Sequence, residues 1–395
     1  MRPFGFFVHH QGRGHAKRCE AILAELDDRP VTIFCADRDL FRSQTLDDPR
    51  VTFVDLPNHI GDPSETPGLF DQTTPEIMHC VPMGSALMRE NAALFVEWFQ
   101  RAKPGLFFVD VSAEWAMLAR LCSVPAVKVR MHGDRNDPGH LGAYQACVGM
   151  VAPFHESIEQ ADYPADLRAK TFYSGGLCTT TAPVPARAEA RVKLGLDPDR
   201  EIILTLSGGG GSGAPYAPLT MGARALPEAL WLTIGPLHRE GHETDFANLR
   251  NLGWVDNPID WIAAADVVIA SAGDNTVHEI ARVGRPYLCV PEWRYFDEQV
   301  AKARELARIG AAHTLSRWPG SNGQWRMAIA NAKALEAEAI EPLFDADAAG
   351  RIARHLVALD ERLWARRESR DANVVPLSPA RSGLAIEGAV AKPEK

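Results

Sequence analysis

The stretch of sequence that decides the fold is residues 266–299, DVVIASAGDNTVHEIARVGRPYLCVPEWRYFDEQ. An apolar run at 267–270 predicts a buried strand, and the polar segment 271–276 follows it. A helix is predicted from Thr276, and a second strand ends at Pro291. The polar segments after both strands lie at their carboxyl ends, the edge at which open α/β sheets hold ligands. The stretch therefore predicts a strand–helix–strand unit with a ligand site on that edge.

The same alternation of short apolar runs and amphipathic segments covers most of the chain. Strands are predicted at 4–8, 31–36, 51–56, 106–111, 126–129 and 148–152, and in a second series at 202–207, 230–234, 251–255, 267–270 and 286–290. Amphipathic helices are predicted between several of them, at 16–26, 77–99 and 113–121. This pattern favours mostly parallel sheets wrapped by helices, which is the α/β class.

A turn-rich segment, residues 171–185, separates the two series of strands. We therefore expect two facing Rossmann-like domains, 1–170 and 186–345, joined by this linker and enclosing an interdomain cleft. Residues 346–367 predict a final amphipathic helix with Ile352, Leu356, Leu359 and Leu363 on one side. Residues 368–395 are polar and small with three prolines, a composition typical of a disordered tail.

Composition limits the classes of partner and compartment. The 395 residues include 42 Lys+Arg and 51 Asp+Glu, a net charge of −9, which argues against nucleic acid as the main partner. The seven cysteines contain no Cys-x-x-Cys pair, so neither a zinc site nor a disulfide framework is predicted. We find no signal peptide and no apolar run of membrane-spanning length. We expect a cytoplasmic protein, for which peripheral contact with a membrane stays open.

A glycine-rich segment after the first strand, Gln11-Gly12-Arg13-Gly14-His15, leads into a helix. Glycines let the backbone approach a ligand, and the helix N-terminus disfavours a protonated imidazole, so neutral His15 can act as a base. Asp110 ends the strand that begins at residue 106, and it can orient His15 as in a triad. The alternatives are local: His15 packs or caps the first turn, and Asp110 or Ser112 caps the helix near Ala113.

A second glycine-rich loop follows the first strand of the second series. It comprises Ser207, Gly208, Gly209, Gly210, Gly211, Ser212, Gly213 and Ala214. Its amides could cradle a diphosphate. The spacing also matches Gly-x-Gly-x-x-Gly, so an NAD(P)-dependent oxidoreductase is an alternative of another class. That alternative requires an acidic residue after the next strand, where Gly235-Pro236 stands instead.

The segment 253–299 resembles the donor-binding half of GT-B glycosyltransferases. The similarity is to the branch that includes the peptidoglycan N-acetylglucosaminyltransferase and the macrolide and plant natural-product glycosyltransferases. It covers nearly the whole chain to about residue 345, is strongest over 253–299 and is weaker over 40–100. The resemblance implies transfer of a sugar from a nucleoside diphosphate sugar, UDP-linked, to a hydroxyl acceptor. It further implies inversion, no cofactor, and His15 and Asp110 as the catalytic pair. A nucleotide-sugar hydrolase and a catalytically silent nucleotide-sugar-binding protein of the same fold stay open.

The resemblance also assigns donor-binding residues. Glu279 is expected to accept hydrogen bonds from the ribose hydroxyls, although Thr276 and Glu279 also fit a capping box. The residues assigned to the diphosphate part of the donor lie in two loops and the helix start that follows the second: Gly208, Gly209, Gly210, Gly211, Ser212, Ser271, Gly273, Asn275 and Thr276. Trp254 and Val255 are assigned to the base, with a core position as the alternative for Trp254. The sugar hydroxyls fall to Asp297, Glu298 and Gln299, among which the sequence does not choose.

A polar cluster after the strand at 126–129 lies on the same predicted edge. Gly14, Arg130, His132, Arg135 and Asp137 are the candidates on the acceptor side, with a solvated loop as the alternative. His132, Asp134, Asp137 and His140 do not match an established metal-ligand spacing, so no metal site is predicted.

Overall fold

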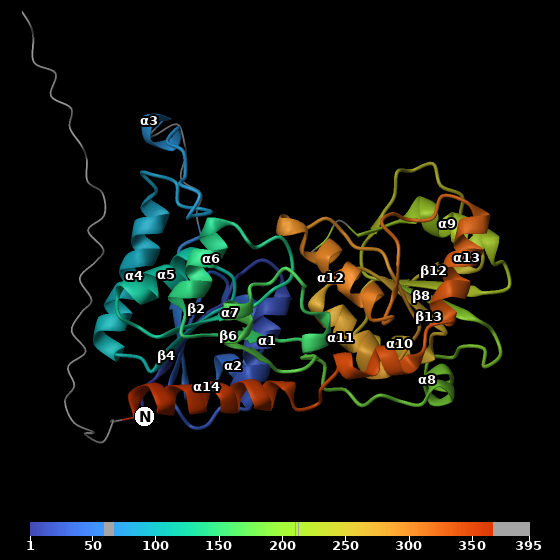
Figure 1. Ribbon diagram of the computed structural model, residues 1–395. Coiled ribbons are helices and arrows are strands. Elements are labelled where there is room, and N and C mark those ends of the chain that lie inside the picture. Colours follow the sequence, from blue (N-terminus) through green and yellow to red (C-terminus); the bar gives the residue numbers. More distant parts are fainter. Residues whose placement is uncertain (59–66, 210, 212, 366–395) are drawn as a thin grey trace, which may run out of the picture.

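The computed structural model describes residues 1–58, 67–209, 211 and 213–365. The first domain is built on a seven-stranded, all-parallel sheet (Figure 1). Its strands, in spatial order, are β3 (Val51–Asp55), β2 (Val31–Cys35), β1 (Phe4–Phe7), β4 (Leu106–Val109), β5 (Ala126–Val129), β6 (Gly149–Ala152) and β7 (Thr171–Tyr173). The inner strands β1, β2, β4, β5 and β6 are buried along their whole length, as near-continuous apolar runs in a parallel sheet should be.

Helices cover both faces of this sheet. They are α1 (Arg13–Ala24), α2 (Ser43–Leu46), α4 (Ala86–Ala102), α5 (Ala113–Leu121), α6 (Pro138–Ala146) and α7 (Ala165–Arg168), with single turns η1 (Arg38–Leu40) and η3 (Glu156–Ile158). A further short helix, α3 (Pro67–Phe70), projects away from the sheet (Figure 1). The helix predicted at 77–99 begins only at Ala86, so its first part was wrong. Gly84 has φ 79°, and the Ser85 side chain caps the helix by accepting from the Met88 amide.

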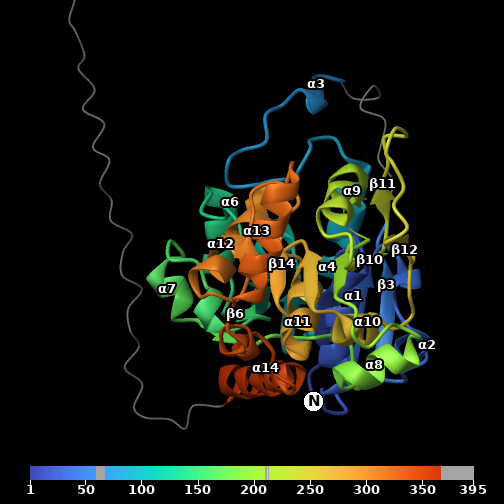
Figure 2. The same cartoon turned by 90° about the vertical axis from the view of Figure 1, so that its right-hand side faces the viewer.

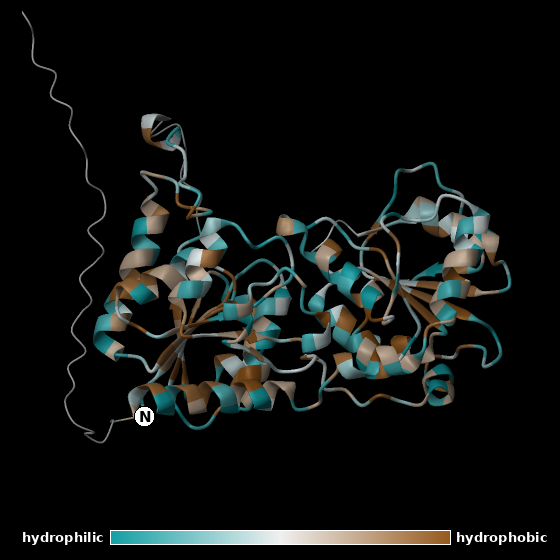
Figure 3. Cartoon of the chain, viewed as in Figure 1, coloured by the Kyte–Doolittle hydropathy of each residue, from teal (hydrophilic) through white to brown (hydrophobic). Residues whose placement is uncertain are grey.

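The second domain has a six-stranded parallel sheet and a separate two-stranded one (Figure 2). The large sheet runs β12 (Leu249–Asn251), β10 (Leu230–Ile234), β8 (Ile202–Leu206), β13 (Val267–Ala270), β14 (Tyr287–Cys289) and β15 (His313–Thr314), and β9 (Ala214–Pro215) pairs with β11 (Leu237–His238). The strand predicted at 251–255 lies earlier, at 249–251, because Gly253 turns the chain with φ 65°. The strands of both sheets are the most hydrophobic elements (Figure 3).

The helices of the second domain surround its sheet. They are α8 (Arg187–Lys193), α9 (Tyr216–Ala225), α10 (Pro258–Ala264), α11 (Asp274–Val283), α12 (Glu298–Arg308) and α13 (Asn322–Lys333), with single turns η4 (Tyr295–Asp297), η5 (Ala337–Ala339) and η6 (Glu341–Leu343). No helix among the described residues is both long and apolar enough for a membrane span.

The segment between the domains is shorter than predicted at its start. Residues 171–173 form β7, which pairs with β6, so the first sheet continues three residues into the expected linker. The other predicted boundaries are not tested by the structure.

The last helix, α14 (Ala348–Trp364), returns to the first domain (Figures 1 and 2). Ile352, Leu356 and Leu359 are buried in the core that also holds α1 and β1. Leu363, predicted on the same side, is 40% exposed. The helix therefore ties the chain end to the opposite domain. The predicted disordered tail, 368–395, lies outside the described residues.

Candidate active site

His15 and Asp110 lie in contact at the carboxyl edge of the first sheet. His15 is in the first turn of α1, and Asp110 directly follows β4, the neighbour of β1. The Nδ1 atom of His15 contacts Oδ2 of Asp110. Ser112, and not Asp110, caps α5 by accepting from the Trp115 amide. The structure thus brings the predicted pair together, and its catalytic role stays a prediction.

Arg18, which the sequence analysis did not single out, completes this pair. It lies one turn after His15 on α1, is buried, and donates to Oδ1 of Asp110 at 2.8 Å. Burial alone would raise the pKa of Asp110, but Arg18 and His15 together hold it well below its usual value. The Asp110 carboxylate is therefore charged at neutral pH and can balance a proton on His15.

The catalytic pair is connected to the second domain through Asp274, the first residue of α11. Arg18 Nη1 lies 3.5 Å from Asp274 Oδ2, and the Lys302 ammonium contacts Oδ1 of the same carboxylate. Burial would raise the pKa of Asp274, yet Lys302 and Arg18 lower it far below the ordinary range. Sequence gave no signal for this link, because α11 was expected to start at Thr276, two residues after Asp274.

Glu279 is buried on α11 and accepts a hydrogen bond from the Thr180 hydroxyl at 2.5 Å. The capping-box alternative for Glu279 is wrong. The helix begins at Asp274 with Gly273 at its N-cap, so Thr276 is already inside the first turn. Burial raises the pKa of Glu279. A carboxylate held by one hydroxyl from the interdomain segment is chemically suited to hydroxyl ligands.

The first turn of α11 lies beside the first turn of α1, which holds His15. A Cβ atom at Gly14 would be 3.2 Å from Nδ2 of Asn275, so glycine permits this close approach. Asn275 also accepts from the Thr179 hydroxyl at 3.4 Å. The Ser271 carbonyl accepts from the Tyr287 hydroxyl at 2.7 Å. The predicted donor loop and the predicted base thus lie side by side.

The glycine-rich loop after β8 faces the loop after β14. A Cβ at Gly211 would lie 2.1 Å from Oε2 of Glu292, and one at Gly209 would lie 3.4 Å from the Trp254 ring. Gly210 and Ser212 lie outside the described residues. The loop does not open directly into a helix, because β9 intervenes before α9 begins at Tyr216.

Trp254 is 68% exposed, so the core alternative for it is wrong. Val255 is partly buried against the core of the second domain.

The three residues assigned to the sugar differ in their surroundings: Gln299 and Glu298 have different partners, and Asp297 is exposed. Gln299 is buried, and its Oε1 accepts from the Glu292 amide at 2.8 Å. Glu298 forms an ion pair with Arg135 of the first domain at 3.0 Å. Asp297 is exposed and has a left-handed backbone with φ 51°. Among the three, Glu298 is thereby committed to a contact between the domains.

Three of the acceptor-side candidates, Arg130, His132 and Arg135, are buried, whereas Gly14 and Asp137 are partly exposed. Arg130 pairs with Glu159 at 2.7 Å, with both side chains buried, so its assignment to the acceptor has no support here. His132 Nε2 lies 2.7 Å from the Ile158 carbonyl, and Arg135 donates to the His132 carbonyl at 2.8 Å. These groups hold the first domain together at its border with the second.

Asp137 caps α6 and contacts two histidines, His79 and His140. The ligand atoms of these three residues lie within 4.8 Å of one another, and no other group of this kind occurs in the part of the chain that the structure describes. However, Arg135 approaches Nε2 of His140 at 2.9 Å and can only donate, which places the His140 proton on Nδ1, toward Asp137. This arrangement fits a hydrogen-bonded triad better than a cation site.

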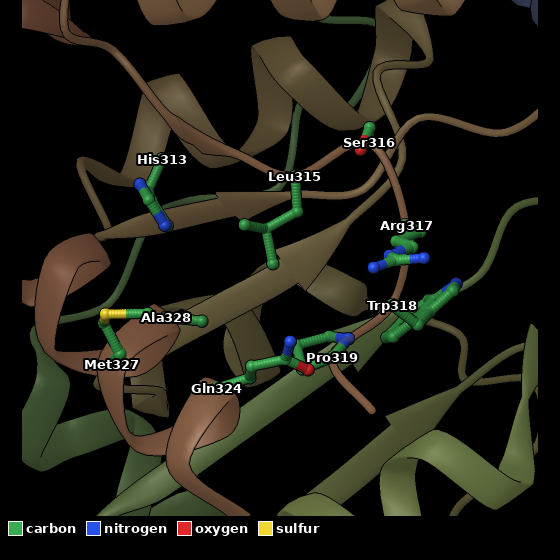
Figure 4. Close-up of a pocket in the computed structure, with 9 residues that line it drawn as sticks. All are labelled: His313, Leu315, Ser316, Arg317, Trp318, Pro319, Gln324, Met327 and Ala328. Carbon is green, nitrogen blue, oxygen red and sulfur yellow. The ribbon is translucent and has the colours of Figure 1, made fainter. Parts of the chain in front are cut away.

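A cavity of about 220 Å³ lies elsewhere, at the edge of the second sheet (Figure 4). Leu315, Trp318 and Met327 are among the residues that line it, and none of the predicted site residues does. The interdomain cleft expected from the sequence stays a prediction.

Comparison with known proteins relates the second domain to glycosyltransferases. Residues 227–317 match the Glycosyltransferase family 28 C-terminal domain. Over 119 residues the chain is 34% identical to UDP-N-acetylglucosamine--N-acetylmuramyl-(pentapeptide) pyrophosphoryl-undecaprenol N-acetylglucosamine transferase of Sorangium cellulosum (strain So ce56). That alignment covers 28% of this chain and spans only 29% of the relative's length.

Solved structures are similar over nearly the whole chain. Acinetobacter baumannii MurG superposes with a TM-score of 0.62 at 16% identity, covering 91% of this chain and 100% of that one. A UGT transferase from Siraitia grosvenorii in complex with UDP gives 0.60 at 14% identity, with 90% and 99% covered. The spinosyn rhamnosyltransferase SpnG complexed with thymidine diphosphate gives 0.55 at 18%, with 91% and 96% covered. The fold is GT-B. The predicted resemblance to this branch of GT-B proteins is confirmed.

Proposed function

We propose that the protein is a glycosyltransferase that moves a sugar from a UDP-linked donor to a hydroxyl acceptor. The single observation that carries the proposal is the contact chain from His15 through Asp110 and Arg18 to Asp274. It places a candidate base beside the first turn of α11, a helix within the segment that matches family 28.

In the proposed reaction, His15 Nε2 takes the proton of the acceptor hydroxyl while Asp110 contacts Nδ1 and balances the imidazolium. The acceptor oxygen forms a bond to the anomeric carbon, and the bond from that carbon to the diphosphate oxygen breaks. The acceptor oxygen attacks from the face opposite the nucleoside diphosphate, which leaves with the electron pair, so the configuration of the anomeric carbon inverts. Amides of the 208–213 loop and the N-terminus of α11 stabilise the departing charge without a metal or cofactor.

The donor contacts are proposed from the same helix. Glu279 exchanges the Thr180 hydroxyl for the ribose hydroxyls, and the segment 297–299 contacts the sugar. The printed names of the similar proteins include both UDP and thymidine diphosphate, and we propose UDP because the sequence relative is named for a UDP sugar. The acceptor is not carried over from any relative. We further propose a cytoplasmic protein that can contact a membrane peripherally.

A two-step assay tests this proposal. UDP-glucose, UDP-galactose, UDP-N-acetylglucosamine and NAD(P)H are first screened for thermal stabilisation, and nucleotide release is then measured with and without a panel of hydroxyl acceptors. We expect stabilisation by a UDP sugar, release that depends on an acceptor, and turnover that survives EDTA. Release without any acceptor would indicate a hydrolase, and stabilisation without turnover a silent binder. Turnover that vanishes in EDTA and returns with Mg²⁺ would contradict the metal-independent mechanism.

A further inference from the structure

The loop after β14 holds two consecutive non-glycine residues in the left-handed backbone region. Phe296 has φ 60° and ψ 25°, and Asp297 has φ 51° and ψ 31°. Only two other non-glycine residues among those described have positive φ, Lys103 and Ser123. This conformation is costly for residues with a Cβ, so a pair of them persists only where the surroundings hold them.

Phe296, the first residue of this pair, is held by the other domain, while the Asp297 amide donates to the Arg294 carbonyl of its own loop at 3.1 Å. The Phe296 ring lies 4.6 Å from the His140 ring in an edge contact and 5.6 Å from the His79 ring, measured between centroids. The Arg135 guanidinium lies 5.0 Å from the centre of the Phe296 ring. The backbone is held as well, since the Phe296 carbonyl accepts from the Asp134 amide at 2.6 Å. Ring and carbonyl are thus both bound by the first domain.

The seat for the ring is itself fixed. Asp137 contacts His79 at 2.6 Å and also contacts His140, while it accepts from the amides of Gly139 and His140 at the start of α6. A Cβ at Gly139 would lie 2.5 Å from Nε2 of His79, so the histidine packs directly on the helix backbone. The two histidines that contact the Phe296 ring are therefore held in place by other residues of the first domain.

Gly133 is required for the backbone part of this contact. It has φ 116°, and a Cβ there would lie 2.5 Å from the Phe296 carbonyl oxygen and 3.1 Å from the Glu298 Cα. Any larger residue at this position would push the loop away.

We propose that Phe296 is a positioning residue through which the first domain sets the conformation of the loop, and with it the preference for a sugar on the nucleotide. Asp297 follows Phe296 directly, Glu298 pairs with Arg135, and the Gln299 side chain closes the loop on the Glu292 amide. Residues 297–299 are those proposed to contact the donor sugar, so this inference rests on the proposed function. Glu279 and the start of α11 lie outside the loop, and nucleotide binding by them is independent of Phe296.

The experiment uses three variants of the full-length protein. Phe296→Ala removes the ring, and Gly133→Ala displaces the Phe296 carbonyl. Gly195→Ala is the matched control, because Gly195 also has positive φ, 63°, but a Cβ there would meet nothing within 4 Å. The control thus carries the same kind of backbone strain without the contact between domains.

Two measurements are made on each variant. Hydrogen exchange of the amides at 295–300 measures how readily the loop opens, and it does not depend on activity. We expect exchange faster by on the order of tenfold in Phe296→Ala and Gly133→Ala only. Affinities for UDP, UDP-glucose and UDP-N-acetylglucosamine are then measured by calorimetry, and their ratios give the preference for a UDP sugar over UDP. We expect UDP affinity to stay unchanged, while the preference for a UDP sugar over UDP falls by about tenfold.

Exchange equal to wild type in both test variants would overturn the proposal, since the loop would then hold without its seat. Faster exchange with an unchanged preference for the UDP sugar would overturn the link to the sugar. If the wild-type protein binds no UDP sugar, the proposed function fails and the sugar preference with it. The exchange data still report separately on the loop, so the two failures can be told apart.

Discussion

At the level of single residues, the centre of the site is the Nδ1 atom of His15. It contacts the Asp110 carboxylate, and Arg18 Nη2 lies 3.2 Å away. Asp110, with its strongly lowered pKa, can only accept and Arg18 can only donate, so the two partners make opposite demands on Nδ1; the closer contact is with Asp110 and favours the proton on Nδ1 and the lone pair on Nε2. The neighbouring His9 cannot add a second charge at neutral pH, because burial, His15 and His10 lower its pKa to about 4. This is the proton arrangement that a general base requires.

The first prediction concerns this pair. His15→Ala should reduce turnover about 10²- to 10⁴-fold with nucleotide affinity nearly intact, because only the proton transfer is lost. Adding Asp110→Asn should cost little more, since residues that act as a unit are not additive. Steady-state kinetics and calorimetry check both statements. Equal losses that multiply in the double variant would show that His15 and Asp110 act independently.

The second prediction concerns Glu279. Glu279→Ala should weaken UDP binding by about 1.5–3 kcal/mol, the range for hydrogen bonds to charged groups. Thr180→Val is the companion variant, because it removes the hydroxyl that now occupies the Glu279 carboxylate. We expect it to leave UDP affinity unchanged or improved. Calorimetry that finds equal UDP affinity in Glu279→Ala would remove Glu279 from the nucleotide site.

The residues that sequence reasoning found and missed differ in a physical way. His15 and Asp110 follow predicted strands, so the topology of a parallel sheet alone brings them to one edge. Arg18, Lys302 and Phe296 look like ordinary surface residues of helices and loops. Arg18 and Phe296 have partners across the domain border, and Lys302 pairs with Asp274 of a different helix of its own domain, so no local pattern predicts these contacts.

At the level of elements, the last helix shows how far periodicity can be taken. Its apolar spacing correctly predicted a helix packed on the first domain, but Leu363 lies beyond the end of the covered surface. Where a helix stops being covered depends on the partner and not on the helix itself.

The third prediction uses this contrast within α14. Leu356→Ala should lower the free energy of unfolding by about 2–5 kcal/mol, because Leu356 is buried in the core of the first domain. Leu363→Ala, at 40% exposure, should have an effect within about 0.5 kcal/mol. Urea denaturation of the two variants checks this. Similar losses in both would mean that α14 does not anchor the chain through Leu356.

The fourth prediction concerns the packing of α11 on η6. His278 Nδ1 donates to the Leu343 carbonyl at 2.9 Å, and burial lowers the pKa of His278 to about 4. The unfolded state, with a pKa near 6.5, binds the proton first, so stability from this group is full above pH 6.5 and is lost as pH falls toward 4. From pH 7 to pH 5 the loss should be about 2 kcal/mol.

His278→Asn provides the test, because its amide can donate to the same carbonyl but does not titrate. Denaturation curves at pH 7 and pH 5 should show a smaller difference in the variant than in the wild type. An identical pH dependence in both proteins would exclude His278 as its source.

At the level of the whole molecule, the sequence predicted the two sheets better than their arrangement. Buried apolar strands identify themselves, and all but β7, β9, β11 and β15, which are two or three residues long, were expected close to their places. The border between the domains is instead polar: Arg18 meets Asp274, Arg135 meets Glu298, and Arg308 donates to the Ser157 carbonyl. Such contacts have no periodicity, so the border cannot be derived from a hydrophobic pattern.

The last prediction tests whether this polar border couples the domains. Asp274 is the only acid in the described residues that contacts both Arg18 of the first domain and Lys302 of the second. Asp274→Asn leaves the buried Lys302 ammonium with a neutral partner and leaves Arg18 with Asp110 alone, and removing one member of a buried pair costs about 3–5 kcal/mol. Because Arg18 and Asp274 belong to different domains, we expect scanning calorimetry to show a lower unfolding temperature and a less cooperative transition.

Arg18→Met in the same chain should recover part of the loss, with a coupling energy of about 0.5–3 kcal/mol. Asp245→Asn, which breaks an exposed pair with Arg239 within one domain, is the control and should leave the transition unchanged. Additive losses from Arg18→Met and Asp274→Asn would contradict the coupling.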